Sequence, residues 1–195
     1  MSTINSTIAY FGYGSLVNLG SLRTPYISAH RATLKGWQRK WLSRPAEPGS
    51  FATREGLAFL SVVKSADSEI DGMLITDHSS SLASLDKREA LYSRVTIDAV
   101  DMHMHDEDLD VPEKFLYVAD EVPTVENNGE TKILRSYLDV VMQGYLNHFG
   151  VEGIERFYAT TLNFELKILE DREQPLYPRA TTLTEEEKSI FTRFR

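Results

Sequence analysis

The stretch Thr7-Ile8-Ala9-Tyr10-Phe11-Gly12-Tyr13-Gly14-Ser15-Leu16 joins a short apolar run to a glycine-rich loop. An apolar run of this length that ends at a glycine is typical of a buried β-strand followed by a turn. Gly12 and Gly14 let the backbone turn sharply and approach a ligand without a Cβ in the way. Such a loop can present several N–H groups to one anion, and the Ser15 hydroxyl adds a donor. The stretch predicts a strand and then either a carboxylate- or oxyanion-binding loop or a simple tight turn.

The glycine spacing excludes two nucleotide-binding motifs. A Rossmann fingerprint needs G-x-G-x-x-G, but position 17 is Val and the next glycine is Gly20. No phosphate-binding lysine follows the loop, which excludes a P-loop.

Strand patterns fill most of the chain up to residue 120, and helical spacing dominates the remainder. We expect strands over 7–12, 29–43 with a bend or bulge at Gly36, 57–63, 70–76, 94–105 and 115–119, with a polar turn over 65–68. We expect helices over 79–92, 132–149, 151–160 and 184–194, the last one started by a capping box at Thr184. Because βαβ alternation is missing, the pattern favours an α+β fold with a mostly antiparallel or mixed sheet, open or closed into a barrel.

A glutamate interrupts the apolar stripe of the predicted helix over 79–92. At about 100° per residue, Glu89 falls between Leu82 and Leu85 on the face that should meet the core. A carboxylate buried there must be paired, neutralised or functional. Desolvation raises the pKa of a glutamate towards the range that a general acid–base residue needs. The alternative is a structural glutamate that Arg88, placed on the far flank of the helix, or Arg94 satisfies.

The composition narrows the class of protein. The chain has 195 residues, 42% of them hydrophobic, and we expect one domain over 1–195 with a helical C-terminal extension from about residue 130. A net charge of −8 disfavours nucleic-acid binding, and the lack of cysteine excludes disulfides and thiolate chemistry. The chain shows no secretory pattern over 1–10 and no apolar run long enough to cross a bilayer, so we expect a cytoplasmic protein without membrane contact. The sequence does not indicate an oligomeric state.

The glycine-rich loop and the glutamate, in this order, resemble the γ-glutamyl cyclotransferase superfamily, which includes the ChaC-like and AIG2-like proteins. The matching segments are 11–16, 34–39, 70–74 and 85–92, and together they cover residues 8–120 in the order of that family. The resemblance implies a small mixed or antiparallel β-barrel with flanking helices. It also implies a pocket at one end of the barrel, between the loop and the glutamate.

The resemblance further implies an activity and a set of site residues. Tyr13, Gly14, Ser15 and Leu16 would hold a γ-glutamyl group, and Glu89 would act as general acid and base. Tyr117, on a later strand, would help to shape the pocket. The reaction would close the γ-glutamyl group to 5-oxoproline and release the attached amine, and it needs no metal and no cofactor. A non-catalytic γ-glutamyl-binding module, and an amidase or acyl transferase that uses the same glutamate, are the alternatives.

Two further features stay open at this point. The proline-rich segment 171–179 fits a solvated loop better than a lid that brings Tyr177 or Arg179 to the substrate. Asp101, His103 and His105 alternate along one strand, but an exposed strand end explains them better than a metal site does.

Overall fold

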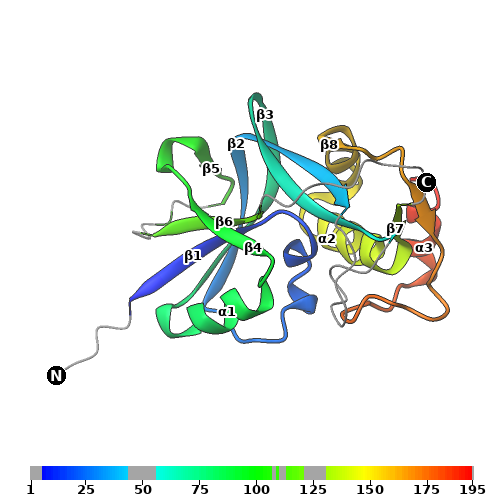
Figure 1. Cartoon of the computed structure of the whole chain (residues 1–195), viewed down its shortest axis with the longest axis horizontal. Helices are drawn as coiled ribbons and strands as arrows, with labels where there is room; N and C mark the ends of the chain where they lie inside the picture. Colours follow the sequence, from blue (N-terminus) through cyan, green and yellow to red (C-terminus); the bar gives the residue numbers. More distant parts are fainter. Residues whose placement is uncertain (1–5, 44–55, 107–108, 110–112, 121–130, 195) are drawn as a thin grey trace.

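The computed structural model describes residues 6–43, 56–106, 109, 113–120 and 131–194. The strands are β1 (Thr7–Gly12), β2 (Ser28–Ser43), β3 (Ala58–His78), β4 (Tyr92–Thr96), β5 (Met102–Met104), β6 (Lys114–Ala119), β7 (Lys132–Leu134), β8 (Thr161–Leu162) and β9 (Lys167–Leu169). The helices are α1 (Leu82–Arg88), α2 (Arg135–Ala159) and α3 (Glu185–Phe191), and single 3₁₀ turns cover Ser15–Val17, Leu19–Ser21, Ser79–Ser81 and Ala99–Asp101. The elements α2, α3 and β7 lie together at one end of the molecule, beside the main sheet (Figure 1).

The main sheet is mixed and mostly antiparallel, as expected, but the described strands do not close a barrel. Its strand order is β4-β6-β1-β3-β2-β5, with β8 added beside β2, and β7 pairs with β9 in a separate small sheet. Within the main sheet, only the pairs β1–β6 and β2–β8 are parallel. The outer strands β4 and β5 each pair with a single neighbour, so the path stays open. The barrel that the resemblance implied is therefore replaced, in the described residues, by an open sheet.

The two short strands expected over 57–63 and 70–76 form one continuous strand, β3, which pairs with β2 in a long antiparallel ladder. The pairing shifts between Lys35↔Glu69 and Trp37↔Lys64, so that four residues of β3 face Gly36 alone. Gly36 takes a φ of 78°, which a glycine adopts without strain. The predicted bulge at Gly36 is confirmed. The predicted polar turn over 65–68 is instead the other side of that bulge, where the side chains are partly or fully exposed.

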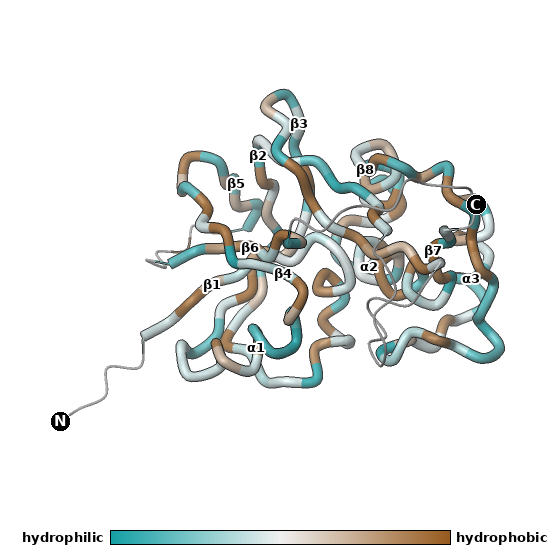
Figure 2. The backbone as a smooth tube through the Cα atoms, in the orientation of Figure 1, coloured by the Kyte–Doolittle hydropathy of each residue, from teal (hydrophilic) through white to brown (hydrophobic). Residues whose placement is uncertain are grey.

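The core lies between the inner strands and α2. Hydrophobic stretches gather where the strands meet and along α2, whereas the outer part of the β2–β3 ladder is largely hydrophilic (Figure 2). Helix α2 begins three residues later than expected, after the short strand β7, and Gly150 (φ 67°) divides it at the expected boundary between two helices. The capping box at Thr184 is confirmed, since Glu187 N–H donates to Thr184 Oγ1 and Thr184 N–H donates to the Glu187 carboxylate.

The strand expected over 94–105 is divided in the structure. Residues 92–96 form β4, which pairs with β6, and residues 102–104 form β5 at the opposite edge of the sheet. The 3₁₀ turn at Ala99–Asp101 carries the chain between these two positions. None of the helices in the described ranges is long and apolar enough to cross a membrane.

Candidate active site

Two adjoining cavities meet beside the glycine-rich loop. The inner one is small, about 50 Å³, and its lining includes all six residues predicted for the site: Tyr13, Gly14, Ser15, Leu16, Glu89 and Tyr117. The outer cavity measures about 260 Å³ and shares Ser15, Leu60, Glu89, Tyr92 and Tyr137 with the inner one. Glu89 therefore borders both cavities.

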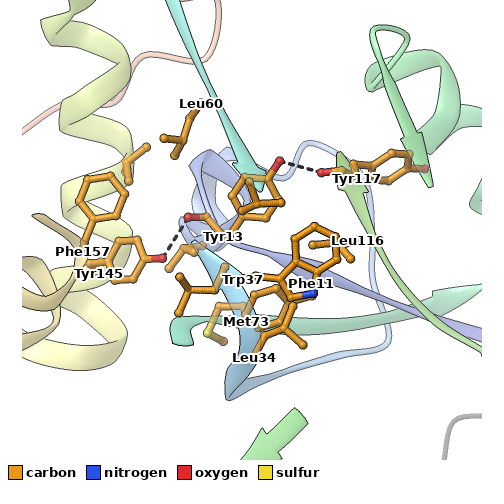
Figure 3. Packing of buried hydrophobic residues seen from close by; sticks show 14 of the residues in the cluster. Phe11, Tyr13, Leu34, Trp37, Leu60, Met73, Leu116, Tyr117, Tyr145 and Phe157 are labelled. Atoms are coloured by element: carbon orange, nitrogen blue, oxygen red, sulfur yellow. Dashed lines mark hydrogen bonds between the residues drawn. The ribbon is translucent and has the colours of Figure 1, made fainter. Parts of the chain in front are cut away.

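The glycine-rich loop is fixed from both sides of the fold. The Tyr13 hydroxyl donates to the Tyr117 carbonyl at 2.7 Å, and the Tyr145 hydroxyl donates to the Tyr13 carbonyl at 3.0 Å, so that Tyr13 bridges β6 and α2 (Figure 3). Beyond the loop, the Asn18 side chain donates to the Val140 carbonyl of α2 at 3.0 Å. A loop that is held at both ends keeps its backbone groups in place for a ligand.

A buried arginine, Arg39, that the sequence analysis missed binds the backbone of the glycine-rich loop. Arg39 of β2 is fully buried, and its Nε donates to the Tyr13 carbonyl at 3.0 Å. Its Nη2 donates to the Asp71 carbonyl and to the Tyr145 hydroxyl, and its guanidinium lies 5.1 Å from the centre of the Tyr145 ring. Strand periodicity held the signal for this position, because Arg39 alternates in step with Trp37 and Trp41, which are buried.

Glu89 lies at the C-terminal end of α1, one residue past the last helical one. Its backbone (φ −101°, ψ 34°) leaves the helix and turns the chain towards β4, while its N–H still donates to the Leu85 carbonyl at 2.9 Å. The Glu89 side chain is 18% exposed and directed towards the cavities. Burial raises the pKa of its carboxyl, and the nearby charges of Arg88 and Arg179 oppose that rise.

Arg88 faces the interior beside Glu89, and the far-flank position expected for it is wrong. Because α1 ends at Arg88, ideal helical spacing no longer places the two residues on separate faces. Arg88 Nε lies 3.1 Å from Glu89 Oε1, and the arginine side chain is 12% exposed. Arg94, the other proposed partner, instead pairs with Asp86 at 3.2 Å.

Two tyrosines complete the inner cavity. Tyr117 is buried, and its hydroxyl donates to Asp86 Oδ1 at 2.8 Å, which directs the ring across the cavity wall. Tyr137, in the first turn of α2, lines both cavities, and a Cβ added at Gly14 would lie 2.9 Å from its hydroxyl. Along the helix expected over 132–149, the helical spacing of Tyr137 is that of a core residue. Its position near the helix start, where the chain faces the loop, could not be read from periodicity.

The segment 171–179 runs along the outer cavity: residues 173–176 and 178 are exposed, as expected for a solvated loop, but Tyr177 and Arg179 are only partly exposed. Tyr177 and Arg179 line the cavity with Pro178 between them. The ring of Tyr177 meets that of Tyr137 edge to face at 4.9 Å. Asp171 anchors the segment: its carboxylate accepts the N–H and hydroxyl of Ser136 at 2.8 and 2.5 Å, and the Leu176 N–H at 2.9 Å.

Replacing Asp171 should therefore both destabilise the protein and loosen the outer cavity. Ser136 lies in the first turn of α2, whose own N-cap side chain makes no capping bond, so Asp171 supplies that function from a distance. We expect Asp171→Ala to lower the free energy of unfolding by about 1–3 kcal/mol, since two buried hydrogen bonds and one partly buried one lose their acceptor. Denaturant unfolding measures this, with Asp67→Ala, at an exposed position of β3, as the control. Equal stability of the two variants would contradict the anchoring role.

The histidines set aside in the sequence analysis take no part in this site. The rings of His103 and His105 lie 5.6 Å apart, and His105 Nε2 is 2.7 Å from the Thr33 hydroxyl. In the described ranges, no group of three or more His, Asp or Glu side chains is arranged to hold a metal ion.

Comparison with known proteins relates the fold to a group of solved structures. The chain is similar to a γ-glutamyl cyclotransferase, with a TM-score of 0.62 and 14% identity over 96% of this chain and 99% of that one. It is also similar to an uncharacterized protein from Homo sapiens (TM-score 0.56, 15% identity, 96% and 99% covered). A third similar structure is YkqA from Bacillus subtilis (TM-score 0.56, 19% identity, 78% of this chain and 53% of that one). No protein-family model and no curated protein sequence matches the chain.

These similarities show that the chain has the γ-glutamyl cyclotransferase fold, and they confirm at that level the resemblance found in the sequence. At such low identity they establish the fold alone. The roles of individual residues rest on the geometry of the two cavities.

Proposed function

We propose that the protein cyclises a γ-glutamyl compound to 5-oxoproline and releases the attached amine. The observation that carries this proposal is the position of Glu89, a largely buried carboxylate on the border between the inner cavity at the glycine-rich loop and the larger outer one. In this proposal the inner side receives the γ-glutamyl group and the outer side receives the leaving amine. The γ-glutamyl cyclotransferase fold supports the same assignment.

The nucleophile in this reaction belongs to the substrate. The α-nitrogen forms a bond to the γ-carbonyl carbon, and the bond from that carbon to the leaving nitrogen breaks. The ring nitrogen keeps one of the three protons of the α-ammonium group, and the other two reach the leaving nitrogen, which departs as an ammonium ion. Ionised Glu89 is the group that accepts and returns these protons, and such transfer contributes a factor of about 10² to 10⁴ in rate.

The remaining site residues hold the substrate in its folded conformation. Ring closure within one molecule gains mainly from orientation, so a rigid cavity is the chief requirement. The backbone N–H groups of Gly14, Ser15 and Leu16 would hold the α-carboxylate or the γ-oxyanion. Tyr13 and Tyr117, joined by the hydrogen bond from the Tyr13 hydroxyl, would form the wall against which the γ-glutamyl chain folds.

A γ-glutamyl-binding module without catalysis is the second candidate, and the contact between Arg88 and Glu89 favours it. An arginine 3.1 Å from the glutamate is what a purely structural carboxylate needs. Against this, the pKa of Glu89 is still raised despite that arginine, because burial outweighs the charges of Arg88 and Arg179. A carboxyl of this kind can change its protonation state during turnover.

One assay separates these candidates. The protein is incubated with γ-glutamyl amides, dipeptides and glutathione, and the products are identified by mass. We expect 5-oxoproline and the free amine from at least one compound. Free glutamate or an exchanged amide would point to an amidase or acyl transferase, and binding by calorimetry without any product would support the binding module.

A further inference from the structure

The hydroxyl of Tyr117, a residue of the inner cavity wall, donates its only proton to a neighbouring carboxylate. Tyr117 lines the inner cavity together with Glu89, and its hydroxyl donates to Asp86 Oδ1 at 2.8 Å. Asp86 stands on α1, three positions before Glu89, and lines neither cavity. A tyrosine hydroxyl has one proton to donate and can also accept hydrogen bonds through its oxygen. With the proton directed at Asp86, the acceptor side of the hydroxyl is what remains for a ligand.

A second donor keeps Asp86 in the role of acceptor. Arg94 Nε, on β4, lies 3.2 Å from the same Oδ1 that accepts from Tyr117. The Arg94 guanidinium also lies over the Phe115 ring, 5.6 Å from its centre. Arginine does not give up its proton in proteins, and a carboxylate can only accept. Asp86 therefore faces one donor from β4 and one from β6, and this pairing fixes the direction of the Tyr117 proton.

Glu89 is the competing acceptor for that proton. Burial and the hydrogen bond to Asp86 raise the pKa of Tyr117, and the nearby charge of Glu89 adds to this rise. A hydroxyl that donated to Glu89 would stabilise the ionised carboxylate and lower the pKa of Glu89. A carboxylate with a lower pKa is a weaker base for the proposed proton transfer. The bond between Tyr117 and Asp86 avoids this effect.

The proposed reaction brings an ammonium group to the same place. Glu89 takes a proton from the α-ammonium group of the substrate, which therefore lies at the end of the inner cavity that Glu89 and Tyr117 share. An ammonium group offers three donors and needs acceptors. We propose that Asp86 is a positioning residue, which holds the Tyr117 hydroxyl as an acceptor for the α-ammonium group and keeps it from donating to Glu89. This inference rests on the proposed function and adds a residue to its machinery.

The acid limb of the pH profile tests the direction of the Tyr117 proton. In Asp86→Ala the hydroxyl is free to donate to Glu89, so the acid limb of kcat/KM should move to lower pH. The value of kcat/KM should also fall by roughly 10- to 100-fold, the loss of one hydrogen bond to a charged group. Asp86→Asn should restore most of both, because its carbonyl oxygen meets the same two donors, Arg94 and Tyr117. An asparagine variant that behaves like the alanine variant would overturn the inference.

Tyr117→Phe distinguishes positioning from a merely structural role of Asp86. In the Tyr117→Phe background, Asp86→Ala should shift the acid limb no further and lower kcat/KM little more, since Asp86 acts through the hydroxyl that is already gone. A residue that only anchors α1 would cost the same activity in both backgrounds. That result would reject the positioning role.

The control variant is Asp98→Ala, which removes an exposed carboxylate that makes no capping bond and lines neither cavity. It should leave kcat/KM and the acid limb as in the wild type. A shifted limb in this variant would mean that any loss of negative charge moves the pKa of Glu89, which would overturn the inference. The other titratable groups that interact with Glu89 are unchanged in all these variants: Arg88 of α1, Arg179 of the segment 171–179, Tyr10 of β1, Tyr13 of the loop and Tyr137 of α2.

Failure of the proposed function gives a different result from failure of the positioning role. If the wild-type protein yields no 5-oxoproline, the cyclisation itself falls. The acceptor role of Tyr117 is then measured by calorimetric titration with γ-glutamyl-alanine and with glutaryl-alanine, which lacks only the α-amine. Tighter binding of γ-glutamyl-alanine that is reduced in both Tyr117→Phe and Asp86→Ala supports the inference. Equal binding of the two compounds, or a preference that neither substitution changes, rejects it.

Discussion

Replacing Glu89 by glutamine should lower the rate of 5-oxoproline release by about 10²- to 10⁴-fold while the protein stays folded. Glutamine keeps the size of the side chain and can still accept one hydrogen bond, but it cannot take a proton from the α-ammonium group. Because burial disfavours the ionised carboxylate despite the Arg88 guanidinium 3.1 Å away, the neutral amide should cost little or no stability. The measurement is kcat/KM together with a thermal unfolding curve for the same preparation.

Glu155→Gln is the matched control for this variant, since Glu155 is exposed on α2 and lines neither cavity. It should retain wild-type activity. A Glu89→Gln protein that keeps more than a tenth of the wild-type rate would show that another group moves the protons.

The pH dependence gives an independent view of the same carboxyl. Burial raises the folded-state pKa of Glu89, and only the ionised form can act as the base. Activity should therefore be lost as the pH falls through this raised pKa, which lies above the ordinary value of 4.5 for a glutamate. Arg179 lowers the pKa of Glu89, so Arg179→Met should move the acid limb of kcat/KM to higher pH.

Local sequence patterns predicted much of this molecule because they depend on near neighbours. Strand β1, the bulge at Gly36 and the capping box at Thr184 each follow from a few adjacent residues, and all three are found. The interior direction of Glu89 was also correct, since Leu82 and Leu85 define the buried side of a short helix. What failed was the extent of that helix: it ends at Arg88, so Glu89 leaves the helical spacing and its carboxylate lies beside Arg88.

The outer cavity could not be predicted, because its residues meet only through the tertiary fold. Tyr177 and Arg179 stand in a proline-rich segment with no periodic pattern, and Asp171 fixes it by binding Ser136, 35 positions earlier in the chain. Whether the sheet closes into a barrel could not be predicted from local patterns either. Whether the outer strands pair with each other depends on the twist and bend of the whole sheet, which no local pattern encodes.

Arg39→Met should be the most destabilising of the substitutions considered, with a loss of about 2–4 kcal/mol in the free energy of unfolding. Methionine fills much of the space of the arginine stem but supplies no donor. The Tyr145 hydroxyl has one proton, so it can donate to only one of the Tyr13 and Asp71 carbonyls at a time, and the other carbonyl loses the donors that Arg39 and Tyr145 now supply. Denaturant unfolding measures this loss.

A double-mutant cycle with Tyr145 shows whether this network also holds the glycine-rich loop. Tyr145→Phe alone removes one hydroxyl and should cost about 1–2 kcal/mol. Because both side chains serve the same two carbonyls, the losses in Arg39→Met and Tyr145→Phe should not add in the double variant. Additive losses would mean that the two residues act separately. Tyr13 carries one of those carbonyls and lines the inner cavity. The less stable variants should therefore also bind γ-glutamyl compounds more weakly, because Arg39 holds the loop that lines this cavity.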